Sequence, residues 1–320
     1  MENEFKARIK YLGDIKPFLK NVCADYGIGK YIAHKAILSG YEDFNLIIET
    51  DAGKYFAKVY ANFRSNKDCL NLTNTLVKIV ESGVNHPKLI KSPQDYLYIK
   101  QFDKYEFRLI LMEYIDGVNF LEGNLTPNEE EKQFLVNQAA LINSVDLKPD
   151  FVYDSWAIVN FLKEYEKSKS CLDGEVLEKI ELLVEKFKTL DIKALPHCFV
   201  HGDIIKTNVL KDQNGKLYII DFSVSNFYPR IVELAVLLCN MLFDESNPTG
   251  QENYELALNE YQKKIKLTDL ELETLPLFVK IAHAMHVIRG TYEREVNNNQ
   301  SGENAYFINL GKVGLGIKKD

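Results

Sequence analysis

The stretch HGDIIKTNVL at residues 201–210 places a histidine, an aspartate and an asparagine in the spacing H-x-D-x4-N: His201, Asp203 and Asn208. A second apolar run, YIIDFSVSN, follows shortly after and contains Asp221. A carboxylate among apolar residues is costly to bury unless it has a partner. These positions therefore predict a role in binding a cation or in hydrogen bonding.

Phosphoryl transfer is a reaction that requires this set of groups. One carboxylate orients or deprotonates the attacking hydroxyl, while a second carboxylate and an amide oxygen hold magnesium against the phosphates. Magnesium prefers oxygen ligands, which both Asp and Asn supply. A metal hydrolase that uses aspartates alone would not explain the asparagine at this spacing.

Composition and charge narrow the class of protein. The 320 residues are 46% hydrophobic and 27% charged, as in a globular protein with a large core. A net charge of −7 disfavours nucleic acid and anionic membrane as partners. The five cysteines are far apart and form no C-x-x-C, so they suggest neither a zinc site nor a disulfide framework. A cytoplasmic protein is expected.

No segment reads as a targeting or membrane sequence. The first residues mix charges with apolar residues at helical spacing, which is unlike a signal peptide. The longest apolar run, IVELAVLLCNMLF at 231–243, contains Glu233 and is too short to span a bilayer. It predicts a buried core helix.

The first 112 residues predict a small antiparallel sheet with one or two helices. NLIIET and KYFAKVY are strand-like runs joined by DAG, a strong hairpin signal. YLYIKQF and FRLILMEYI predict a second antiparallel pair. Helical periodicity runs from Phe5 to Val22, with an interruption near Pro17 and an end at 27–29, and a further helix is expected at 66–81.

From residue 117 onward the patterns are mainly helical. TPNE at 126–129 predicts a capping box that opens a helix to about Val145, and Asp154 predicts the cap of a helix reaching Lys169. A strongly amphipathic helix is expected at 173–190. Further helices are expected near 230–244, 251–265 and 269–290, the last opened by TDLE at 268–271, with a polar loop at 296–304.

Together, HGDIIKTNVL and YIIDFSVSNFYPRIVELA resemble the aminoglycoside phosphotransferase and choline kinase superfamily, which includes one type of homoserine kinase. Its catalytic loop reads H-G-D-x4-N and its metal motif D-F/W-x, where protein kinases have H-R-D and D-F-G. The resemblance covers about residues 31–290. It implies an α+β, protein-kinase-like bilobal fold, with an antiparallel-sheet N-lobe at 1–112 that binds nucleotide and a mainly helical C-lobe at 113–320.

The resemblance also implies roles for single residues. Asp203 becomes the catalytic base, or the residue that orients the hydroxyl, and Asn208 and Asp221 become magnesium ligands. His201 is interpreted as a prop that holds the loop by hydrogen bonding, because kinase mechanisms assign this histidine no proton transfer.

The nucleotide site implied by the resemblance lies in the first lobe. Lys58, inside YFAKVY, would contact the phosphates of ATP, although a surface lysine is also common on an alternating strand. In LMEYIDG at 111–117, the backbone of Glu113 and Ile115 would hydrogen-bond the adenine and Met112 would face it. A plain strand edge leading into a turn is the alternative for this segment.

Three features depart from the pattern. The loop SGYEDFN at 39–45 lies where a glycine-rich phosphate loop is expected, yet it has one glycine. Asn143 stands where many relatives have histidine. The segment between Arg64 and Val80 contains no glutamate that could form the ion pair expected for Lys58. The polar residues there include Asp68, Asn71 and Asn74.

The expected function is an ATP- and magnesium-dependent kinase for a hydroxyl on a small molecule, acting as a monomer or homodimer. Candidate acceptors are an amino alcohol, a hydroxy amino acid such as homoserine, or an aminoglycoside or sugar. The alternative is a nucleotide-binding pseudokinase or regulatory module without acceptor turnover. A protein kinase is disfavoured, because Gly202 replaces the arginine of H-R-D and PRIVELA follows DFS without room for an activation loop.

The acceptor site of this superfamily lies between the catalytic loop and the C-terminal helices. Carboxylates and an aromatic ring in that part of the chain could bind a cationic amine, or could equally be solvated helix residues; they are Asp244, Glu245, Tyr292, Glu293 and Glu295. His283 and His286 lie three residues apart without acidic neighbours and are interpreted as core or surface histidines.

Overall fold

The computed structural model describes residues 6–37, 43–172, 174–248 and 250–318. The chain divides into two units, which are described separately. The first comprises Met1–Gly117 and Leu210–Ile220, and the second comprises Val118–Val209 and Asp221–Asp320.

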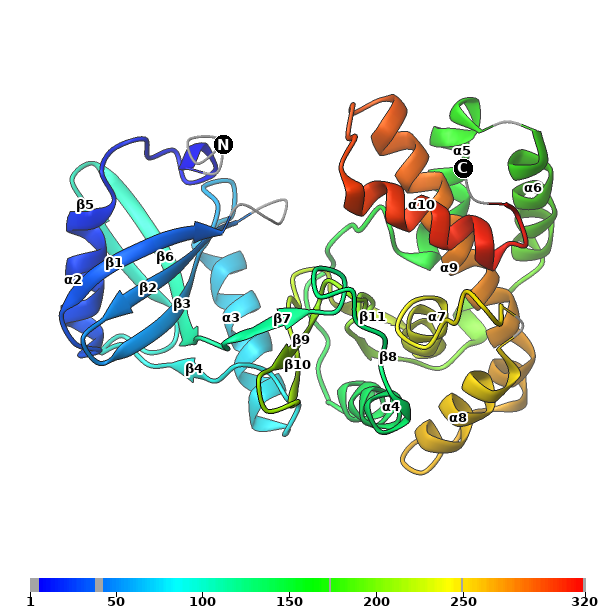
Figure 1. Cartoon of the computed structure of the whole chain (residues 1–320), viewed down its shortest axis with the longest axis horizontal. Helices are drawn as coiled ribbons and strands as arrows, with labels where there is room; N and C mark the ends of the chain where they lie inside the picture. The colour runs from blue at the N-terminus through cyan, green and yellow to red at the C-terminus, as the bar shows by residue number, and fades with distance from the viewer. Residues whose placement is uncertain (1–5, 38–42, 173, 249, 319–320) are drawn as a thin grey trace. The chain divides into compact units, whose positions relative to one another are not determined.

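The first unit contains a six-stranded sheet in the order β1-β2-β3-β6-β4, with β5 also paired to β6 (Figure 1). Its strands are β1 (Tyr31–Ile37), β2 (Phe44–Thr50), β3 (Gly53–Val59), β4 (Leu89–Ile90), β5 (Tyr98–Phe102) and β6 (Tyr105–Glu113). Both expected hairpins, β2–β3 and β5–β6, are confirmed as antiparallel pairs. Lys58 lies in the middle of the sheet, opposite Asn45 on β2 and Ile110 on β6.

Helices α2 and α3 belong to this sheet unit. Helix α2 (Lys16–Tyr26) carries Pro17 in its first turn and ends at Gly27, whose φ of +64° suits glycine. Its apolar side packs into the same core as the strands, with Phe18 stacked on Phe107 at 4.2 Å between ring centroids. Helix α3 (Asn66–Glu81) has the predicted bounds and is opened by a capping box between Ser65 and Asp68.

The segment 210–220, which lies inside the range expected for the helical lobe, is part of the first unit. Strands β9 (Val209–Asp212) and β10 (Leu217–Ile219) form a small sheet with β7 (Gly117–Asn119), in the order β10-β9-β7. Strand β10 belongs to the first unit because it is hydrogen-bonded to Asn85, which lies after the end of α3. The Ile219 N–H donates to the Asn85 carbonyl at 2.8 Å, and the Asn85 side chain donates to the Leu217 carbonyl.

The second unit is mainly helical, as expected. Its helices are α4 (Glu129–Asn143), α5 (Phe161–Ser168), α6 (Gly174–Lys188), α7 (Ile231–Cys239), α8 (Gln251–Tyr261), α9 (Asp269–Glu295) and α10 (Gly302–Gly314), and its short strands β8 (His197–Val200) and β11 (Asn226–Pro229) pair with each other. Helix α9 packs against α5, α6, α7 and α10. The antiparallel sheet followed by helices confirms the α+β class.

Several predicted boundaries in this unit were wrong. The capping box of α4 joins Asn128 to Glu131 in place of Thr126 to Glu129: the Asn128 side chain accepts from the Glu131 N–H, and α4 begins two residues later than expected. Asp154 forms a turn with the N–H of Trp156, and α5 starts only at Phe161. Helix α10, capped by Ser301, was not predicted, since its small residues lack a clear apolar periodicity.

The apolar run at 231–243 forms helix α7 and the turn after it, and its side chains are almost all buried. Within the described ranges, no helix combines the length and the hydropathy that crossing a bilayer would need.

Candidate active site

The catalytic-loop motif leaves β8 as a loop whose backbone requires its glycine. Gly202 has a φ of +77°, a conformation that side chains other than glycine adopt only with strain. Ile204 is fully buried and anchors the loop in the core. The Ile205 N–H donates to the Asp203 carbonyl at 3.0 Å, which tightens the turn around Asp203.

Asp203 and Asn208 are joined directly. The Asn208 Nδ2 donates to the Asp203 Oδ2 at 2.6 Å and to the Asp203 carbonyl at 3.0 Å. The His201 Nδ1 accepts from the Asp203 N–H at 3.1 Å, while its ring is fully buried and packs on Phe222 at 4.3 Å. The amide orientation of Asn208 follows from these bonds, and its Oδ1 is the atom that remains to meet a cation.

A fully buried glutamate on α7, Glu233, holds the backbone of the loop. Its carboxylate accepts from the N–H of His201 at 2.7 Å and from the N–H of Gly202 at 3.2 Å. Burial raises the pKa of Glu233 to about 7, while these hydrogen bonds act in the opposite direction. Sequence reasoning noted Glu233 only as a charge in an apolar run; a lone carboxylate in such a run was the signal that it must have partners.

Asn143 completes the support of this carboxylate. Its Nδ2 donates to the Glu233 Oε2 at 3.3 Å and to the Phe199 carbonyl at 2.9 Å, and its Oδ1 accepts from the Tyr261 hydroxyl at 2.7 Å. Asn143, which stands where many relatives have histidine, therefore supports Glu233 behind the loop. Both its amide nitrogen and its amide oxygen form hydrogen bonds there.

Asp221 lies directly after the β9–β10 hairpin and has a φ of +64°, which is uncommon for a residue other than glycine. Its carboxylate is exposed and accepts from the N–H of Ser223 at 3.4 Å. A positive φ at a residue other than glycine costs free energy, so the surrounding structure must hold Asp221 in this conformation and thereby fix the direction of its side chain.

Asp203 lies among other carboxylates. Burial, and then the charges of Asp154 and Asp221, raise the pKa of Asp203 well above its ordinary value, while the hydrogen bond from Asn208 acts in the opposite direction. Glu303, near the start of α10, contributes in the same sense as the other acids. Asp154 and Glu303 were not predicted as site residues, because the sequence separates them from the loop by some fifty and one hundred residues.

In the first unit, Asp43 is the acidic partner of Lys58. The Lys58 Nζ lies 3.7 Å from the Asp43 Oδ2, and the Asp43 Oδ1 accepts from the Arg64 Nε at 3.1 Å and the Ala61 N–H at 2.9 Å. Asp43 is buried and directly precedes β2. Of the expected phosphate loop at 39–45, residues 39–42 lie outside the described ranges. Asp68, the nearest helix acid, caps α3 instead.

The expected hinge lies at the end of β6. The Glu113 N–H donates to the Lys88 carbonyl at 2.9 Å, so of its backbone groups only the carbonyl could serve a base. Glu113 and Ile115 line a depression of about 300 Å³ together with the turn between β9 and β10. Met112 is buried inside β6 and does not belong to this lining.

The acidic residues expected at the acceptor site are engaged locally. Glu293 pairs with Arg289 at 2.5 Å, and the Tyr292 ring lies 4.8 Å from the Arg289 guanidinium. Asp244 accepts from the N–H of Ser246, and Glu295 pairs with Arg294 at 2.8 Å. Glu245 interacts electrostatically with Lys206 of the catalytic loop. Glu245 therefore acts on a residue of the loop that carries Asp203, whereas the contacts described for the other residues are local.

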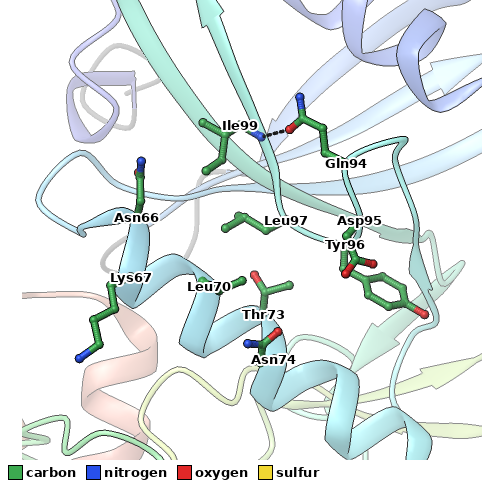
Figure 2. A pocket seen from close by; sticks show the side chains of 10 residues that line it. All are labelled: Asn66, Lys67, Leu70, Thr73, Asn74, Gln94, Asp95, Tyr96, Leu97 and Ile99. Atoms are coloured by element: carbon green, nitrogen blue, oxygen red, sulfur yellow. Dashed lines mark hydrogen bonds between the residues drawn. The ribbon is translucent and has the colours of Figure 1, made fainter.

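A larger depression in the first unit lies elsewhere. It measures about 480 Å³ and is formed by α3 and the segment 94–99, with Thr73 and Leu97 facing it in Figure 2. The residues that line it include no predicted site residue.

A family model and a relative of known name match most of this chain. A family model described as "Phosphotransferase enzyme family" matches residues 34–264. A homoserine kinase from Parvibaculum lavamentivorans is 22% identical over 268 residues, which cover 82% of this chain and 81% of that protein.

Two solved structures share the fold. The amicoumacin kinase hAmiN superposes with a TM-score of 0.65 at 17% identity, covering 98% of this chain and 96% of the other. The choline kinase LicA from Streptococcus pneumoniae gives a TM-score of 0.61 at 12% identity, covering 95% and 99%. These likenesses confirm the kinase-like α+β fold.

Proposed function

Because the chain belongs to the phosphotransferase enzyme family, we propose that it is an ATP- and magnesium-dependent kinase that phosphorylates a hydroxyl group of a small molecule. The observation that supports this most directly is the Asp203–Asn208 pair, in a loop whose backbone at His201 is held by the buried carboxylate of Glu233. Phosphoryl transfer depends chiefly on positioning and on neutralising charge, and this arrangement provides the rigid positioning.

Asp203 is proposed to align the acceptor hydroxyl and take its proton. A carboxyl group whose pKa is raised is a better proton acceptor near neutral pH than an ordinary aspartate. His201 does not act on the substrate in this account, because its Nδ1 is occupied by the Asp203 N–H and its ring is buried.

Asn208 and Asp221 are proposed to hold magnesium. Both offer oxygen atoms, which is the donor type that magnesium prefers, and the Asn208 amide is already turned so that its nitrogen faces Asp203. When bound, the ion would neutralise charge on the phosphates. It would also offset the crowding of negative charge around Asp203.

Lys58 is proposed to contact the phosphates of the nucleotide, with Asp43 in the role that a helix glutamate has in other kinases. The backbone of Glu113 and Ile115 is proposed to receive the adenine, in the depression that they line. Met112 is a weaker candidate for contact with the base, since it is buried inside the strand.

The acceptor is proposed to carry an ammonium group. The charges of Asp154 and Glu303 add to that of the proposed metal ligand Asp221 in raising the pKa of Asp203. A cationic amine would offset this surplus of negative charge. Amino alcohols and hydroxy amino acids fit this requirement, and several relatives of the chain are homoserine kinases.

The test is an ATP-consumption screen of the purified protein with homoserine, hydroxylysine, choline, ethanolamine, neutral sugars and aminoglycosides, with and without a chelator of magnesium. Consumption that requires both magnesium and an amine-bearing acceptor is the expected result. Consumption with neutral sugars alone would contradict the acceptor class. ATP turnover that no acceptor stimulates would contradict the kinase assignment and favour a regulatory nucleotide-binding module.

A further inference from the structure

Outside this site, one thiol and two imidazoles lie together in the core of the helical unit. Cys239 is the last residue of α7, and His283 and His286 are neighbours on one face of α9. The Cys239 Sγ lies 3.5 Å from the Nδ1 of His283 and 3.5 Å from the Nδ1 of His286. From the sequence, these histidines are interpreted as core or surface residues, because they have no acidic neighbours; Cys239 is more than forty residues away along the chain.

The two sulfur–nitrogen distances match those around a tetrahedral zinc ion. Zinc binds cysteine sulfur at about 2.3 Å and histidine nitrogen at about 2.0–2.1 Å, which at a tetrahedral angle separates sulfur from nitrogen by about 3.5 Å. A protonated thiol has a single hydrogen and can donate to one imidazole only. The sulfur can accept the second contact from an imidazole N–H, whereas a shared metal accounts for both contacts with one thiolate and two neutral rings.

The ring of His283 is held in place from several sides. A Cβ atom at Gly314 would lie 2.1–2.3 Å from three ring atoms, so this glycine covers the face of the imidazole and leaves its edge toward Cys239. Phe243 packs on the ring at 4.6 Å, and the ring also hydrogen-bonds the backbone of Leu310. Contacts of this kind fix the orientation of the ring, as they do for histidines that bind metals.

We propose that Cys239, His283 and His286 form a binding site for a single zinc ion. One thiolate and two neutral imidazoles are a donor set that zinc favours, and three protein ligands leave a fourth position for water. Tyr306 lies near enough for its hydroxyl and Cys239 to interact electrostatically, and that hydroxyl has no hydrogen-bond partner in the described part of the chain. His286 is partly exposed.

The ion would join α7 to α9 next to the catalytic loop. Asn240, the residue after Cys239, accepts the N–H of Lys206 at 2.9 Å through its side chain. Zinc at this site therefore stabilises the helical unit and does not replace magnesium at Asn208 and Asp221, whose oxygen donors suit the harder ion.

Cobalt substitution of the full chain, after removal of metals with a chelator, tests the proposal. Cobalt bound by a thiolate absorbs in the near ultraviolet through sulfur-to-metal charge transfer, which carboxylate-bound cobalt at the catalytic loop does not show. We expect the band to saturate at one cobalt ion per chain, to disappear in Cys239→Ala and His286→Ala, and to persist in Cys171→Ser and His197→Asn, which remove a thiol and an imidazole elsewhere.

Thermal unfolding supplies a second measurement that does not depend on activity. Zinc should raise the midpoint of the wild-type protein and of the two control variants, and leave His286→Ala unchanged. His286→Ala removes a partly exposed ring and retains the buried thiol of Cys239, so it remains informative if Cys239→Ala does not fold. Absence of the band in the wild type, or its persistence in His286→Ala, would overturn the proposal.

Discussion

The ammonium group of Lys58 lies 3.7 Å from the carboxylate of Asp43, a residue that directly precedes β2 and is almost fully buried. The same carboxylate accepts hydrogen bonds from Arg64 and from the backbone of Ala61. The acid that pairs with Lys58 therefore comes from the start of β2, and not from α3. This explains why no glutamate on α3 is needed.

We expect Asp43→Asn to lower kcat/KM for ATP by about 10–100-fold, because the Lys58 side chain loses the charge that orients it. The variant should also lose about 1–3 kcal/mol of unfolding free energy, since the buried Arg64 is left with a neutral partner. Initial rates at varied ATP concentration and thermal unfolding measure the two effects.

Asp68→Asn is the matched control for that variant. Asp68 is the acid on α3 nearest in sequence, but it caps the helix at an exposed position. Its replacement should leave kcat/KM unchanged. Equal losses of activity in the two variants would mean that Asp43 has no special relation to Lys58.

Gly202→Ala should slow turnover while leaving the protein folded. The added methyl group has room, with its nearest neighbour the Val200 Cγ1 at 3.8 Å, but a φ of +77° costs an alanine about 1–2 kcal/mol. Gly83→Ala provides the comparison, because Gly83 has a φ of +85° and nothing within 4 Å of the new Cβ. Both should lose similar stability in chemical denaturation, and only Gly202→Ala should lose activity. A Gly202→Ala enzyme with wild-type rates would show that the loop backbone is not critical.

Asp154→Asn should move the acidic limb of the pH–rate profile to lower pH. Asp154 helps to raise the pKa of Asp203, so removing its charge lowers that pKa. A base is active when deprotonated, and its activity then persists to lower pH. KM for an amine-bearing acceptor should rise in the same variant. Asp146→Asn, at an exposed position after α4, should change neither quantity.

Glu233→Gln should alter how stability depends on pH. In the folded protein the pKa of Glu233 is about 7, against an ordinary value of 4.5, so its protonated form is favoured by folding. The difference corresponds to roughly 3 kcal/mol of unfolding free energy, fully present below pH 4.5 and lost as pH rises through 7. Denaturant titrations from pH 4 to pH 8 should show this slope in the wild type and a flatter profile in the variant.

The same variant should be about 10–100-fold slower. Each carboxylate oxygen of Glu233 accepts one loop N–H, and the amide nitrogen of glutamine cannot accept the second. An unchanged rate together with an unchanged pH slope would show that the Glu233 carboxylate does not control the loop.

Most of the fold could be predicted from local sequence patterns. The hairpin β2–β3 and the bounds of α3 follow from alternation, from a two-residue turn and from periodicity within short windows. Asp203 and Asn208 were recognisable for the same reason, because their spacing lies within one loop and the structure joins their side chains.

Residues brought together by tertiary packing could not be found in this way. Asp43 approaches Lys58 through strand pairing, and Glu233 reaches His201 from a helix about thirty residues later. Asp154 approaches Asp203 from a segment some fifty residues earlier. The sequence shows that a carboxylate in an apolar run needs a partner, but the identity of that partner depends on the tertiary fold.

The most direct test of the account is transfer of the labelled γ-phosphate of ATP to an amine-bearing acceptor by the wild-type protein and by Asp203→Asn. The substitution keeps the size of the side chain and removes its ability to accept a proton. The account predicts magnesium-dependent transfer by the wild type and a loss of about 10²–10⁴-fold in the variant, with unfolding still cooperative. Transfer by Asp203→Asn at the wild-type rate would contradict it.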